Sequence, residues 1–86
     1  MNSNIESLIN KIFYRARYRG TKEMDIFVYS FVESIVRELN FDELKDLNVI
    51  INLNDEEIIS LCDENNESNN FNKKIIFKLK EFKKNN

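Results

Sequence analysis

The chain has 86 residues, of which 42% are hydrophobic and 33% are charged. This composition predicts one globular domain over residues 1–86 rather than a disordered chain, and we expect that domain to be helical. One glycine and no proline are too few for the many turns of a β-sandwich. A single cysteine cannot form a disulfide framework, and one cysteine without any histidine argues against a zinc or haem site. The net charge of −2 is segregated, because residues 11–22 carry +5 whereas residues 23–67 carry −11.

The chain contains no apolar run that approaches the roughly 20 residues needed to cross a bilayer. Its first apolar residues are spaced for a helix and are interrupted by polar ones, unlike a signal peptide. A lone cysteine suits a reducing compartment. We therefore expect a cytoplasmic bacterial protein that does not insert into a membrane. We also expect the free protein to be a monomer.

The first predicted helix spans residues 5–18 and the second spans residues 22–39. Gly20 separates them, since a glycine just past a helix end often takes the positive φ that stops the helix. Thr21 is placed to cap the second helix. The apolar residues at helical spacing are Ile5, Leu8, Ile9, Ile12, Phe13 and Ala16 in the first helix, and Met24, Phe27, Val28, Phe31, Val32, Ile35, Val36 and Leu39 in the second.

Three further helices are predicted. The third begins at Asn40 or Asp42, the fourth is short and follows an N-cap at Asn54, and the last spans residues 71–83. We expect the Asn-rich segment 63–70 to be a mobile loop. The expected fold is a small all-α bundle of about five helices with short connections. Its remaining apolar positions are Phe41, Leu44, Leu47, Ile50, Ile51, Ile58, Ile59, Leu61, Cys62, Phe71, Ile75, Ile76, Leu79 and Phe82.

A cationic row distinguishes the first helix. Lys11, Arg15 and Arg19 recur at intervals of four, and Tyr14 and Tyr18 lie beside them on the side away from the core. This strip indicates a docking surface. The row is also compatible with a solvated helix face, and the two tyrosines with a cover over the edge of the core.

The Gly20 corner places opposite charges close together. Arg19 precedes it, and Glu23 and Asp25 occupy the first turn of the second helix. On the pattern alone, Arg19 pairs with Glu23 and fastens the two helices. Asp25 lies on the apolar side of its helix, so we expect a structural ion pair between Asp25 and an arginine of the first helix.

The segment from Tyr14 to Asp25 resembles the signature of the succinate dehydrogenase flavinylation factors, which are small assembly factors for the flavoprotein subunit. The heart of that signature is Arg-Gly-x-x-Glu followed by x-Asp, here Arg19, Gly20, Glu23 and Asp25. The resemblance covers roughly residues 8–62 and includes Phe31 and, more weakly, the acidic start of the fourth helix. The residues that depart from the usual pattern are Ala16, Thr21, Glu56 and Leu61.

The resemblance implies a five-helix fold and a role in covalent FAD attachment to the flavoprotein subunit of succinate dehydrogenase. A histidine of the flavoprotein forms that bond, so the resemblance implies an assembly chaperone rather than an enzyme, with no catalytic residue and no stably bound cofactor, since FAD belongs to the partner. Service to a fumarate reductase flavoprotein stays open. The expected partner-binding residues are Arg19, Gly20, Glu23, Arg15, Tyr14, Tyr18 and Lys11, with Asp25 structural.

We expect Arg19 or Glu23 to be accessible, and replacement of either to leave melting nearly unchanged while reducing flavin attachment. Two other classes remain open. A small nucleic-acid binder would use the basic row, although the acidic body and the pI near 5.2 oppose this. A helical adaptor would bind an unrelated protein through another face.

Overall fold

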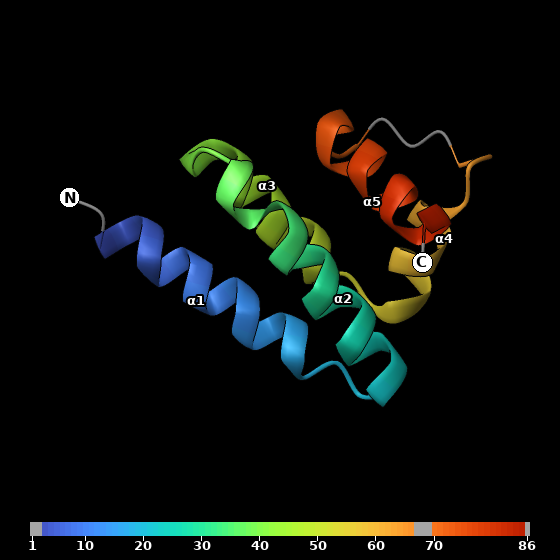
Figure 1. The fold of residues 1–86 in the computed structure, drawn as a ribbon, viewed down its shortest axis with the longest axis horizontal. Helices are drawn as coiled ribbons and strands as arrows, with labels where there is room; N and C mark the ends of the chain where they lie inside the picture. Colours follow the sequence, from blue (N-terminus) through green and yellow to red (C-terminus); the bar gives the residue numbers. More distant parts are fainter. Residues whose placement is uncertain (1–2, 67–69, 86) are drawn as a thin grey trace.

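The computed structural model describes residues 3–66 and 70–85, apart from the side chain of Ser3. The helices of these residues are α1 (Ser3–Arg17), α2 (Lys22–Ile35), α3 (Phe41–Ile51), α4 (Asp55–Cys62) and α5 (Lys73–Asn85), with the 3-10 turn η1 (Val36–Glu38) after α2 (Figure 1). No strand occurs among the described residues. The predicted all-α fold of about five helices is therefore confirmed.

The helix boundaries differ slightly from the prediction. The α-helical part of the second segment ends at Ile35, and its last residues form the tighter turn η1 before the chain becomes extended at Leu39. The last helix begins at Lys73 rather than at residue 71, because Asn72 accepts hydrogen bonds from the N–H groups of Lys74 and Ile75. Part of the predicted loop 63–70 lies outside the described residues, so its mobility stays a prediction.

Two capping boxes fix where α3 and α4 start. The Asn40 side chain accepts from the Glu43 N–H at 2.9 Å, and the Glu43 carboxylate accepts from the Asn40 N–H at 3.0 Å. Asn54 and Glu57 form the same reciprocal pair at 2.8 and 3.1 Å. Each box satisfies two N–H groups that would otherwise lack a partner at a helix end. The predicted cap at Asn54 is confirmed.

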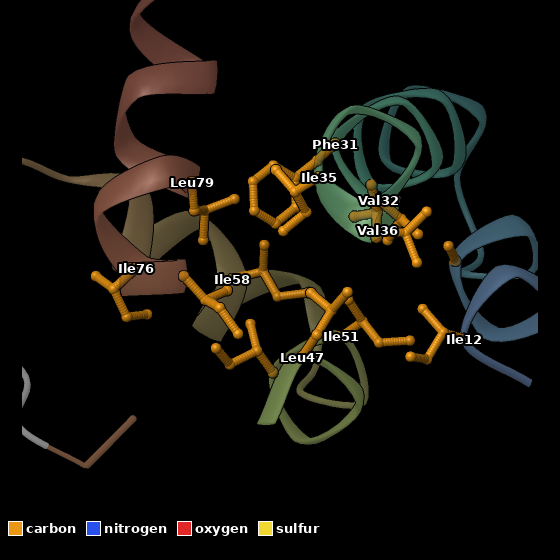
Figure 2. Packing of buried hydrophobic residues seen from close by; sticks show 14 of the residues in the cluster. Ile12, Phe31, Val32, Ile35, Val36, Leu47, Ile51, Ile58, Ile76 and Leu79 are labelled. Carbon is orange, nitrogen blue, oxygen red and sulfur yellow. The ribbon is translucent and has the colours of Figure 1, made fainter. Parts of the chain in front are cut away.

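All five helices contribute to one hydrophobic core. α1 packs against α2 and α3, and α4 packs against α5 (Figure 1). Figure 2 shows side chains of every helix converging, from Ile12 of α1 to Leu79 of α5. Rings of α2 and α5 also meet, since the centroids of Phe31 and Phe82 lie 5.7 Å apart. The predicted apolar stripes thus point inward, because their spacing matches the turn of the helix.

Two predicted apolar positions lie outside the core. Phe41 is the first residue of α3 and is exposed, with the Lys45 ammonium 5.3 Å from its ring centroid. Ile59 is 54% exposed, because it is rotated by one residue from the buried side of α4. No helix among the described residues has the length and apolar character needed to cross a membrane.

Candidate functional site

The connection between α1 and α2 turns sharply at Gly20, whose φ is +122°. No atom lies within 4 Å of where a Cβ would stand, so the position requires the backbone freedom of glycine rather than its small size. Thr21 then caps α2 by accepting a hydrogen bond from the Met24 N–H at 3.2 Å. The predicted corner and its cap are both present.

The Arg19 side chain points into the molecule and is only 1% exposed. Its Nε donates to the Asp55 carboxylate at 2.8 Å, and its two terminal nitrogens donate to the carbonyl oxygens of Ile51 and Leu53. The guanidinium therefore lies between the end of α3 and the start of α4. A cation suits that place, because carbonyl oxygens at a helix end carry partial negative charge.

Asp25 holds the same corner from the other side. Its carboxylate accepts a hydrogen bond from the backbone N–H of Arg19 at 2.6 Å, and the residue is half-buried. The predicted ion pair between Asp25 and an arginine side chain of the first helix is replaced by this backbone contact. The reason is geometric: Arg17 ends α1 and Arg19 turns toward α4, so neither guanidinium approaches Asp25 as an ion-pair partner among the described residues.

Glu23 is exposed on the first turn of α2. No ion pair joins it to Arg19 or to another described residue, so the alternative in which Arg19 and Glu23 fasten the two helices does not describe this structure. Of the two charged residues of the motif on either side of Gly20, Glu23 is exposed to solvent, whereas the side chain of Arg19 is buried. The corner thus combines a buried anchor with an exposed carboxylate.

The cationic row is shorter than predicted. α1 ends at Arg17, so only Lys11 and Arg15 remain on the row, and Arg19 leaves it. Tyr14 and Tyr18 are 62% and 61% exposed, and their rings meet edge to face with centroids 4.9 Å apart. These four side chains and Asn52, the C-cap of α3, line a hollow of about 420 Å³.

Arg17 makes contacts that the sequence pattern did not predict. Its guanidinium carbon lies 5.0 Å from the centre of the Tyr29 ring of α2, and one terminal nitrogen donates to the Tyr29 hydroxyl at 3.2 Å. The charge of Arg17 is therefore held against an aromatic ring at the surface, on the opposite side of the tyrosine pair from Lys11.

Neither a reactive thiol nor a metal-binding cluster lies at this surface among the described residues. Cys62, the one cysteine, is buried at the end of α4, and burial raises the pKa of its thiol, which makes it a poor nucleophile. Among the described residues no group of three or more cysteine or acidic side chains is placed to hold a metal ion. Charged and aromatic groups on a fixed corner suit contact with another macromolecule.

Sequence reasoning missed the partners of Arg19. Asp55, with Glu56 and Glu57, was predicted to be a helix start first and a binding patch second, and backbone carbonyl groups such as those of Ile51 and Leu53 leave no signal in the sequence of side chains. The available signal was the cluster of acids at residues 55–57 at the start of α4. Nothing in the local spacing brings that cluster to residue 19.

A family model described as the flavinator of succinate dehydrogenase matches residues 10–83. That range includes the corner, the buried anchor and all of helices α2 to α4. No curated protein and no solved structure matches the chain significantly.

Proposed function

Because the chain belongs to the family of flavinators of succinate dehydrogenase, we propose that it binds the flavoprotein subunit of that enzyme through the Arg19-Gly20-x-x-Glu23 corner. In doing so it promotes the covalent attachment of FAD to that subunit. The observation that carries the proposal is the difference between the two charged residues of the corner: the side chain of Arg19 is buried, whereas Glu23 is exposed.

The corner is suited to binding because it is fixed before a partner arrives. Asp25 holds the backbone of residue 19, and Arg19 ties that backbone to the α3–α4 connection. A side chain on such a support loses little conformational freedom on binding, which favours affinity. Glu23 is therefore the residue of the motif that we expect to touch the flavoprotein directly.

The chain contributes orientation rather than a reacting group. The resemblance implies that a histidine becomes linked to the flavin, and this chain has no histidine, so that residue belongs to the partner. Holding the partner's flavin and histidine in a reactive arrangement lowers the barrier without a nucleophile from the helper. FAD is accordingly assigned to the flavoprotein and not to this chain.

Capture of the purified flavoprotein subunit on the immobilised chain tests the proposal. Glu23→Ala should weaken capture by about tenfold, a typical loss for a central interface residue. Glu33→Ala is the matched control, since Glu33 is also an exposed acid of α2 without an ion pair to a described residue. Equal capture by Glu23→Ala and the wild type, with both folded, would reject the corner as the binding site.

A further inference from the structure

Three neighbouring hollows with shared lining residues extend along the outer side of α1, from Asn52 at the C-cap of α3 to Ser30 of α2. Tyr14 and Tyr18 line both the first hollow, of about 420 Å³, and the second, of about 330 Å³. Arg17 lines both the second and the third, which has about 310 Å³ and reaches Ile26. We call this surface, from Lys11 across the tyrosine pair to Ile26, the hollowed face.

The charges of the hollowed face are mostly positive. Lys11, Arg15 and Arg17 form no ion pair with a described residue. The acid in its lining is Asp25, whose carboxylate already accepts the Arg19 N–H. The lining of the face thus contains three cationic side chains and one carboxylate, that of Asp25, which is already hydrogen-bonded. The chain as a whole has a net charge of −2. Charge complementarity favours an acidic occupant.

The apolar groups of the face indicate that the occupant is a folded protein surface. Tyr14, Tyr18 and Ile26 are each more than half exposed, at 62%, 61% and 58%. Tyrosine and arginine are among the residues that most often carry binding energy at protein interfaces. Arg17 is already ordered against the Tyr29 ring, so a carboxylate of the partner would meet a guanidinium with little freedom left to lose.

We propose that the hollowed face docks an acidic segment of the flavoprotein subunit that also carries apolar side chains, and that Arg17 and Ile26 are contact residues of this interface. The proposal rests on the proposed function, which supplies the partner. It extends the binding surface beyond the motif corner, and it states the chemistry that the partner must bring.

Titration of the purified flavoprotein subunit with the full chain, at low and at high salt, tests the inference. Arg17→Gln and Ile26→Ser should each weaken the wild-type Kd by about tenfold. The matched controls are Arg37→Gln, an exposed arginine of η1, and Ile59→Ser, an isoleucine of α4 with nearly equal exposure. The controls should change Kd by less than about twofold. Thermal melts of every variant verify that it is folded.

Salt should weaken wild-type binding, and Arg17→Gln should show a smaller salt dependence, because it has lost one charge of the interface. Salt-independent binding would overturn the acidic occupant. Unchanged Kd for both Arg17→Gln and Ile26→Ser, beside weak binding by Glu23→Ala, would overturn the hollowed face but leave the proposed function intact.

Failure of the wild-type chain to bind the flavoprotein would overturn the proposed function and the inference together. Two further experiments test whether nucleic acid or a second copy of the chain binds the hollowed face instead. Binding of duplex DNA or RNA that is lost in Arg17→Gln would assign the face to nucleic acid and overturn the proposal. A concentration-dependent dimer that dissociates in Ile26→Ser would assign it to a second copy of the chain, with the same consequence.

Discussion

Arg19 connects the corner to the start of α4, 36 residues further along the chain, since its guanidinium donates to Asp55 while its backbone N–H donates to Asp25. One residue therefore fixes both the entry to α2 and the entry to α4. Removal of the side chain would leave the Asp55 carboxylate and two carbonyl groups without their donor. The motif arginine is in this sense a structural residue that supports the exposed part of the motif.

Arg19→Ala should lower the free energy of unfolding by about 3–5 kcal/mol, the usual cost of removing one partner of a buried ion pair. This revises the expectation from the sequence that the change would leave melting nearly unchanged. Urea denaturation measures it, and Glu23→Ala serves as the exposed control with a change within about 0.5 kcal/mol. Equal stability of Arg19→Ala and the wild type would show that the anchor is dispensable.

Asp55→Ala extends the same prediction, because the two side chains share one bond at 2.8 Å. Removal of Asp55 takes away one of the three acceptors of the Arg19 guanidinium and leaves the carbonyl groups of Ile51 and Leu53, so it should cost less than removal of Arg19, which takes away all three hydrogen bonds. In a double-mutant cycle the second substitution should add less than it does alone. Strict additivity of the two losses would contradict a direct interaction.

Gly20 should be intolerant of any side chain for reasons of backbone conformation. At φ +122° an L-residue is strained, whereas the surrounding space is empty, so Gly20→Ala and Gly20→Val should each destabilise by about 1–2 kcal/mol. Thermal unfolding of both variants measures this. If alanine were tolerated and only valine destabilised the fold, crowding rather than φ would be the cause.

At the level of helices, α3 is joined to α5 by an ion pair that builds on its capping box. The Lys74 ammonium lies 3.1 Å from the Glu43 carboxylate, which also accepts the Asn40 N–H. These contacts lower the pKa of Glu43, with the hydrogen bond from the Asn40 backbone as the largest cause. The cap and the packing of α5 are therefore linked to the ionisation of one carboxyl group.

A carboxyl group with a lowered pKa stabilises the fold above the pKa of the unfolded state, about 4.3 for glutamate, and this stabilisation is lost as pH falls through the lower folded value. Glu43→Gln should therefore weaken the acid dependence of stability below about pH 4.3. Urea denaturation across this pH range tests it, with Glu33→Gln as the exposed control. An identical pH dependence in Glu43→Gln and the wild type would contradict the assignment.

At the scale of the molecule, the order of the helices, most of the core and the caps follow from local patterns. Apolar spacing places Ile12 and Phe31 inside, and an asparagine followed three residues later by glutamate marks the start of α4. Ile59 shows the limit of this reasoning, since a short helix offers too few turns to fix which apolar residues face the core.

The anchor of the site could not be predicted in the same way. The contact of Arg19 with Asp55 depends on how the α3–α4 connection folds back beside the corner, which is a tertiary arrangement. Its other acceptors are backbone carbonyls, and those carry no residue-specific signal. The motif locates the corner in the sequence, but only the fold distinguishes the buried side chain of Arg19 from the exposed Glu23.

The most direct test of the proposed role is co-expression of the chain with the flavoprotein subunit, followed by flavin fluorescence of the denatured flavoprotein in a gel. The account predicts that Glu23→Ala lowers the covalent flavin per flavoprotein while its melting temperature stays at the wild-type value, and that Glu33→Ala supports normal attachment. Wild-type levels of covalent flavin with Glu23→Ala would contradict the claim that the exposed carboxylate of the corner acts on the flavoprotein.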